Sequence, residues 1–170
     1  MTVNAQFFQE MIDALWTHLS KDTRYAALGL TEFRLSDGNS LPVQDDGRIE
    51  SRRLPAIFVE TIRPEVLERR VEPYREEVQI GLSMGVIYAN KASHQAHSMM
   101  TAAAALMTII DVIANRQAQS GRLGAPGIIS SYSWELGDVE PIIPEGSTEV
   151  SYWIASFTVT LRRTRQVPAL

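Results

Sequence analysis

The chain has 170 residues, of which 45% are hydrophobic, and its formal net charge is -4 at pH 7. This length can bury one good core, so we expect a single domain over residues 1–170. The acidic balance argues against a dedicated nucleic-acid binder, and the lack of cysteine excludes disulfides, thiolate metal sites and cysteine nucleophiles. The N-terminus is too polar for a signal peptide, and no apolar run approaches the ~20 residues that span a bilayer, so we expect a soluble protein.

Arginine dominates the basic residues, since only Lys21 and Lys91 among the 16 are lysines. Arginine is favoured where a planar guanidinium pairs with carboxylates across an interface. A GC-rich genome would produce the same bias, so both explanations stay open.

The first predicted element is an amphipathic helix from about Asn4 to Ser20. Its apolar stripe recurs at helical spacing and consists of Phe7, Phe8, Met11, Ile12, Leu15 and Leu19. Trp16 lies beside this stripe, and we expect it to pack in the core. The helix is expected to dock on the sheet or on a neighbouring subunit.

A long polar loop is predicted at about residues 35–53, where glycine, proline, serine and aspartate crowd between few hydrophobic residues. Such a loop is either a plain mobile connector or a segment that becomes ordered on a partner. We place a candidate interface with other subunits or partners in its charged residues and in two arginines near the end of the last predicted strand. These residues are Asp45, Asp46, Arg48, Arg52, Arg53, Arg162 and Arg163.

Two strands are predicted next. Leu54 to Ile62 is β-rich, with Pro55 near its start, and the dense alternating charge of Arg63 to Pro73 then favours a solvated turn. Glu76 to Tyr88 alternates strictly, with its apolar face formed by Val78, Ile80, Leu82, Met84, Val86 and Tyr88. The opposite face is small enough for another backbone to approach closely and consists of Gln79, Gly81, Ser83 and Gly85.

A long buried helix is expected to follow, with Ser93 as its N-cap and an end near Gln117. Its predicted core face is Met99, Ala102, Ala103, Leu106, Met107, Ile110 and Ile113. Beyond the helix we expect a strand from Ile128 to Leu136 and a rigid, negative loop from Gly137 to Gly146.

The closing strand is predicted from Thr148 to Arg163, with one apolar and one Ser/Thr face. Its core face is expected to hold Trp153, Phe157, Val159 and Leu161, while Ser156, Thr158 and Thr160 point away. At about 16 residues it exceeds an ordinary strand of five or six residues, as does the strand before the long helix. Either bulges bend these strands, or their ends project and pair with a neighbouring subunit, which we favour.

The sequence gives little support for a catalytic or metal-binding site. His94 and His97 have the i, i+3 spacing of metal ligands, but no third ligand is evident, so solvent exposure is the preferred interpretation. Ser83 lies in a G-L-S-M-G run inside an alternating strand, which makes it structural. We therefore expect no enzyme, no catalytic residue, no metal and no cofactor.

The predicted fold is α/β (α+β), a mainly antiparallel sheet packed against a long central helix and an N-terminal helix, in the order α-β-β-α-β-β. This order, with the segments LPAIFVE, EEVQIGLSMGVIY and WIASFTVTLRRT, resembles the tail terminator and tail-completion (head-tail joining) proteins of long-tailed bacteriophages. The resemblance covers Asn4 to Arg163. It implies a virion structural protein whose subunits form a ring, usually a hexamer, on the head-proximal end of the tail tube.

The partners implied are therefore other copies of the chain, the tail tube protein and the neck or connector proteins, with genome DNA passing through the ring without sequence-specific recognition. Other neck, head-completion or tail-tube-related phage proteins are close alternatives. An oligomeric binding module and an enzyme with an unrecognised small-molecule site are alternatives from other classes.

Overall fold

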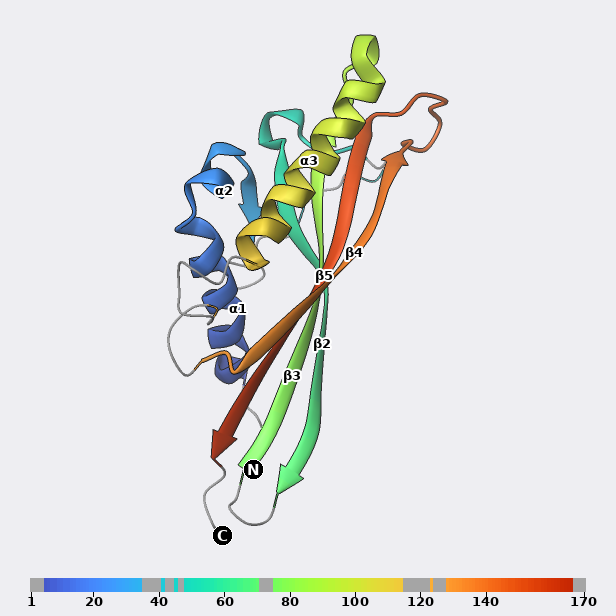
Figure 1. Cartoon of the computed structure of the whole chain (residues 1–170). Coiled ribbons are helices and arrows are strands. Elements are labelled where there is room, and N and C mark those ends of the chain that lie inside the picture. Colours follow the sequence, from blue (N-terminus) through green and yellow to red (C-terminus); the bar gives the residue numbers. More distant parts are fainter. Residues whose placement is uncertain are drawn as a thin grey trace.

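The computed structural model describes residues 5–34, 41, 45, 48–70, 75–114, 123 and 128–166. Two long helices and a short one lie on one side of a five-stranded sheet, which is the predicted α+β class (Figure 1). The helices are α1 (Ala5–Ser20), α2 (Thr23–Ala27) and α3 (Gln95–Ala114), and the strands are β1 (Thr31–Phe33), β2 (Ala56–Arg70), β3 (Arg75–Ala89), β4 (Ser131–Ile142) and β5 (Tyr152–Gln166). Two short 3-10 helices are η2 (Ser51–Arg53) and η3 (Ala92–His94). The sequence analysis missed α2 and β1.

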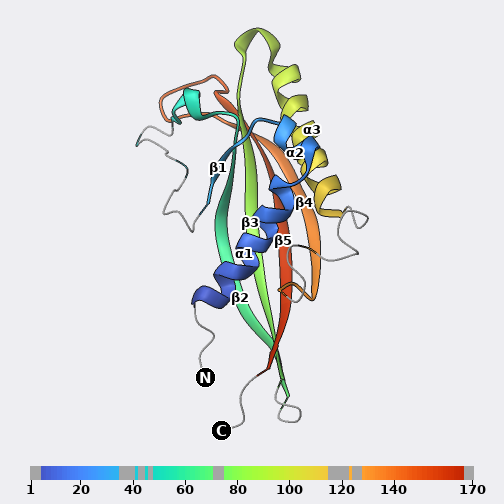
Figure 2. The same cartoon turned by 90° about the vertical axis from the view of Figure 1, so that its left-hand side faces the viewer.

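The sheet has the order β1-β2-β3-β5-β4, and all neighbours except β1 and β2 are antiparallel. The strands β2, β3 and β5 have 15 residues each, and β3 pairs with β5 along its whole length without a register shift. Bulges interrupt β2 at Val59/Thr61 and Val66/Glu68. The far ends of these three strands extend past α1 and β4 as a ribbon (Figures 1 and 2). The projection expected from strand length is therefore present, whereas the pairing of β3 with β5, the two strands that the sequence predicted to be long, contains no bulge.

The main core lies between the sheet and the helices. Trp16 is fully buried, as predicted. The predicted alternation of β3 and β5 is confirmed, because every second residue in the middle of each strand is buried in this core. On β3 these residues are Val78, Ile80, Leu82, Met84 and Val86, and on β5 they are Ala155, Phe157, Val159 and Leu161. Ser156, Thr158 and Thr160 are half-buried, as is Trp153, which packs against the core. The period of two therefore assigned the two faces of β5 correctly.

The buried face of α3 differs from the predicted one. Met107 is 49% exposed, and Met99 and Ala103 are only half-buried. The buried apolar residues are Ala102, Ala105, Leu106, Ile109, Ile110, Val112 and Ile113. The face is therefore rotated toward Ala105, Ile109 and Val112, which pack in the same cluster as α1 and the sheet.

Several predicted boundaries are wrong. The closing strand, predicted from Thr148 to Arg163, runs from Tyr152 to Gln166, and the strand predicted from Ile128 begins at Ser131. The expected turn from Arg63 onward is strand as far as Arg70, because this charged stretch pairs by its backbone with β3. The expected loop after Gly137 is strand as far as Ile142, and Pro141 is tolerated because β4 is an outer strand. Ser93 is not an N-cap, since it lies inside η3 and α3 begins at Gln95.

By length and composition alone, α3 is able to cross a membrane, contrary to the expectation that no such apolar run exists. Its apolar residues instead form a buried face against the sheet and α1, as in the core helix of a globular domain. The predicted extension toward Gln117 lies outside the described residues.

A second, smaller core lies on the other face of the sheet and is made by Phe33, Ile49, Ala56, Ile87 and Tyr152. The N–H of Ile49 donates to the Tyr152 hydroxyl at 3.0 Å, and that hydroxyl donates to the Ile49 carbonyl at 3.3 Å. The end of the long polar loop is therefore held by its own subunit rather than left open for a partner, while residues 35–40, 42–44, 46 and 47 lie outside the described residues.

Candidate assembly surfaces

The predicted interface residues fall at two separate places. Arg52 and Arg53 lie on η2, directly before β2, whose first residue Ala56 pairs with Ile87 near the end of β3. Arg162 lies along β5 opposite Gln79, nearer to the start of β3. The structure therefore does not bring the two arginine groups together. Arg48 and Asp45 are exposed, and Asp46 lies outside the described residues.

The arginines of η2 share one carboxylate. Arg52 Nη2 lies 3.1 Å from Glu50 Oε1, and Arg53 Nε lies 3.2 Å from Glu50 Oε2. The hydrogen bond from Arg52 holds the pKa of Glu50 below its ordinary value. The Arg53 guanidinium also lies 5.9 Å above the ring of Phe33. Two cations and one anion leave this turn with a net positive charge.

Arg162 and Arg163 of β5 make contacts within the subunit. Arg163 Nη1 lies 2.7 Å from Glu10 Oε2, and its guanidinium lies 4.3 Å above the ring of Phe7. This residue therefore ties β5 to α1. Arg162 is exposed and donates from Nε to Gln79 Oε1 at 3.0 Å.

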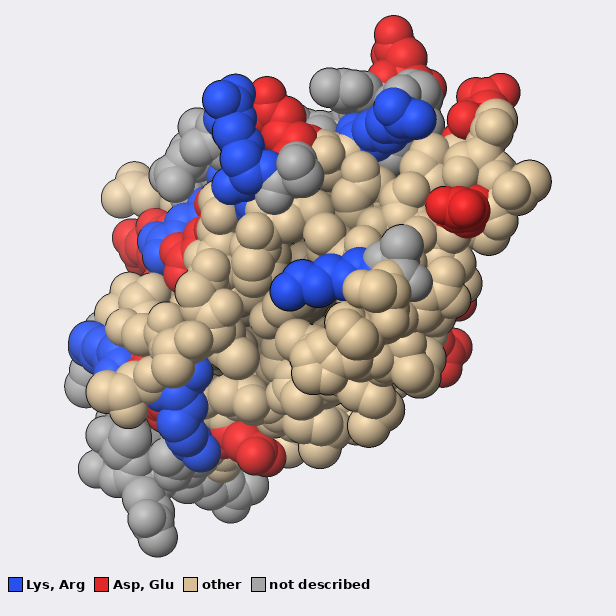
Figure 3. Space-filling view, turned by 90° about the horizontal axis from the view of Figure 1, so that it is seen from above, with Lys and Arg blue, Asp and Glu red and all other residues tan. Residues whose placement is uncertain are grey.

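An acidic edge lies on the opposite side of the sheet from η2. Every charged residue between positions 131 and 150 is an acid, and all five side chains are exposed: Glu135, Asp138, Glu140, Glu145 and Glu149. They belong to β4, the outer strand, and to the connection from β4 to β5. Seen from above, the right-hand margin of the molecule, where this connection lies, carries acidic atoms and no basic ones (Figure 3).

Backbone hydrogen bonds hold the β4–β5 connection in a defined turn. The Ser147 N–H donates to the Pro144 carbonyl at 3.0 Å, and Gly146 supplies the positive φ of 75° that this turn needs. At the base of the turn, the Asn90 N–H donates to the Ser151 carbonyl at 2.8 Å. Pro144 is buried, whereas the large apolar side chain of Ile143 is 51% exposed.

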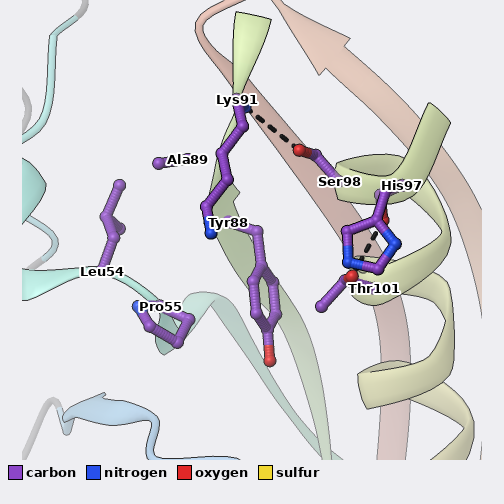
Figure 4. A pocket seen from close by; sticks show the side chains of 8 residues that line it. All are labelled: Leu54, Pro55, Tyr88, Ala89, Lys91, His97, Ser98 and Thr101. Atoms are coloured by element: carbon purple, nitrogen blue, oxygen red, sulfur yellow. Dashed lines mark hydrogen bonds between the residues drawn. The ribbon is translucent and has the colours of Figure 1, made fainter. Parts of the chain in front are cut away.

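A pocket of about 370 Å³ lies between the start of β2 and the first turns of α3 (Figure 4). Leu54 and Pro55 form one side, the ring of Tyr88 lies between, and the helix contributes the other side. The lining residues are Leu54, Pro55, Tyr88, Ala89, Lys91, His97, Ser98 and Thr101. Burial raises the pKa of the Tyr88 phenol, so this hydroxyl stays neutral in the ordinary pH range.

The helix side of the pocket is held by local hydrogen bonds. The Lys91 N–H donates to Ser98 Oγ at 3.1 Å, and Thr101 Oγ1 donates to the His97 carbonyl at 2.8 Å (Figure 4). The Lys91 side chain makes no ion pair with any residue that the structure describes. His97 is exposed, as is His94, in agreement with the preferred interpretation of these histidines. The described residues contain no group of three or more metal-ligating side chains.

Sequence analysis missed this pocket and the role of β4 as an edge. The acids were visible as a negative stretch, but only the strand order places them on the outer side of the sheet. No protein-family model matches the chain, and no curated protein matches it.

Proposed function

We propose that the protein is a structural subunit of a long-tailed phage virion, a tail terminator that forms a ring, most simply a hexamer, at the head-proximal end of the tail tube. Its partners in this proposal are other copies of the chain, the tail tube protein and the neck proteins. It is made in the host cytoplasm and resides in the neck region of the virion. The observation that carries the proposal is the three-stranded ribbon that projects beyond the rest of the fold.

Part of the ribbon is left uncovered by the other described elements of the subunit. Beyond Phe58, β2 has no partner strand on its outer side among the described elements, because β1 covers only Ala56–Phe58. Val66 and Leu67, next to each other on this part of β2, are 46% and 38% exposed. Exposed strand edges with apolar side chains are templates for association, and a protein usually covers them. A tube rim or a neighbouring subunit would cover this one.

Native mass spectrometry and negative-stain imaging test the proposal. We expect a discrete ring-sized species, alone or after addition of purified tail tubes, and density capping one end of the tubes. A chain that stays monomeric with tubes present, and leaves the tube ends unchanged, would refute the assignment. Attachment to heads or connectors without tubes would instead favour another neck or head-completion role.

The pocket beside α3 is the one observation that favours a function of another class, a small-molecule binding module. Its volume falls within the range of about 300–1,000 Å³ that is usual for such sites. A small molecule that raises the melting temperature of a strictly monomeric chain, with the shift abolished by substitution of Thr101 or Tyr88, would support that alternative.

A further inference from the structure

We propose that the pocket between β2 and α3 receives the turn around Ile143 from a neighbouring copy of the chain. This inference rests on the proposed ring, and it names the lateral contact that would build it. The contact would join Ile143 and the acids of the β4–β5 connection to Lys91 and the basic turn before β2.

The two surfaces lie at the same end of the molecule. The sheet register places Ala56 opposite Ile87, Ala89 opposite Tyr152, and Tyr152 opposite Ile142. The pocket and the β4–β5 connection therefore adjoin the same end of the strands. The strand order places β2 and β4 on opposite sides of β3 and β5. One copy thus offers the turn on one side and the pocket on the other.

The turn around Ile143 cannot enter the pocket of its own subunit, because the two lie on opposite sides of that subunit. They are suited to a head-to-tail contact, in which each copy gives its turn to the next and accepts a turn from the previous one. Such a contact closes into a ring when the rotation between neighbours divides the circle evenly. A symmetric dimer would require both turns to enter the partner's pocket at the same time, which needs the turn and the pocket on one side of the subunit, whereas the strand order places them on opposite sides.

The chemistry of the two surfaces is complementary. Ile143 is a large exposed apolar side chain, and the pocket offers Leu54, Pro55 and the ring of Tyr88 as an apolar wall. Lys91 lies on the pocket rim without an ion-pair partner among the described residues, and Glu145 follows Ile143 by two positions. An apolar anchor surrounded by a polar, charged rim is the usual arrangement of a protein interface.

Charge supports the same pairing over a wider area. The segment from 131 to 150 contributes five acids and no basic residue. The turn before β2 contributes Arg52 and Arg53 against the single carboxylate of Glu50, next to the pocket residue Leu54. Opposite charges on the two sides attract unlike surfaces and repel like ones, which favours one orientation of neighbours.

The turn is also preorganised for insertion. After Ile143, the Ser147 N–H donates to the Pro144 carbonyl at 3.0 Å, and before it the Ile142 carbonyl accepts from the Ser151 N–H at 2.9 Å, so the backbone is held on both sides of Ile143. A side chain already held in place loses less conformational entropy on binding, so more of the contact energy contributes to affinity.

Zero-length carbodiimide cross-linking tests the contact directly, because the chain has only two lysines. A mixture of unlabelled and ¹⁵N-labelled protein distinguishes cross-links between copies from those within one copy. We expect mixed-isotope peptides that join Lys91 to Glu145 or to a neighbouring acid of the β4–β5 connection. Lys21, exposed between α1 and α2, serves as the internal control and should give no such peptide.

Matched substitutions measure the energetic contribution. We expect Ile143→Ser to weaken association about tenfold or more, as is common for a central apolar anchor, whereas Met107→Ser should change it less than about twofold. The two side chains are 51% and 49% exposed, so they are equivalent in the free subunit. Lys91→Glu should also weaken association, whereas the control Lys21→Glu should not. Combining Lys91→Glu with Glu145→Lys should restore part of the lost association, because the charge pair is then present in reversed order.

The outcomes separate this inference from the ring proposal. A ring that forms normally with Ile143→Ser and Lys91→Glu, and gives no cross-link from Lys91, overturns the inference and leaves the ring standing. The Lys91 cross-link in open chains that never close supports the inference and contradicts the ring. A chain without any contact between copies overturns both. Circular dichroism of each variant confirms that the fold is retained.

Discussion

Phe157 is expected to be one of the side chains on which the fold depends most. It is 2% exposed, belongs to the main core, and lies opposite Met84 on β3 and Leu136 on β4. Phe157→Ala removes a whole ring from a site that the rigid sheet cannot collapse to fill. Such substitutions cost about 3–5 kcal/mol. For a domain of this length that corresponds to a fall in melting temperature of roughly 6–20 °C, at 2–4 °C per kcal/mol.

The adjacent residue provides the control. Thr158 is half-buried on the other face of β5, and its register partners Ser83 and Glu135 are polar. Thr158→Ala should therefore cost less than about 1 kcal/mol. Both variants are melted at one protein concentration, since association would add concentration-dependent stability. A larger loss for Thr158→Ala than for Phe157→Ala would refute the assignment of the two faces.

Two further predictions concern the second face of the sheet. Gly85→Ala should destabilise the fold by about 1–3 kcal/mol, because its Cβ would lie 2.7 Å from Phe58 Cζ, whereas Gly81→Ala meets nothing closer than 3.9 Å and should be nearly neutral in chemical denaturation. Tyr152→Phe should cost about 1–3 kcal/mol and speed hydrogen exchange at the Ile49 amide, because that amide loses its hydrogen-bond acceptor in a buried site. An Ile49 amide that exchanges equally fast in both proteins would contradict the second prediction.

The spacing of hydrophobic residues predicted correctly those elements that bury a single apolar face. The strict alternation of β3 and β5 and the helical spacing in α1 each bury a single apolar face, so these elements were predictable with their core residues. The second half of β2 was not predictable as a strand, because its dense charge is typical of a solvated turn. It is a strand because β3 offers a full backbone ladder, and hydrogen bonding between backbones does not depend on side-chain polarity.

The candidate assembly surfaces were less predictable than the fold. The arginines before β2 were identified by charge, and the acids near Glu145 were seen as a negative loop. Their relation depends on the strand order, in which β5 lies between β3 and β4 and places the acids on the outside. The pocket joins Leu54 to Thr101, and no local pattern reports a contact between residues so far apart in the sequence.

The proposed ring contact and the projecting ribbon occupy opposite ends of the subunit, which gives each a separate role. Toward the tip of the ribbon, Val78 is the last buried apolar residue of β3, and charged positions follow, with Glu76 opposite Arg69 and Arg165 in the register. Backbone pairing holds this part together, but it buries little apolar surface. Its exposed Val66 and Leu67 therefore gain most from a partner. Substituting Val66 should weaken attachment to the tail tube while leaving ring mass unchanged, and Ile143→Ser should weaken the ring itself, so that the two variants distinguish tube capping from ring closure.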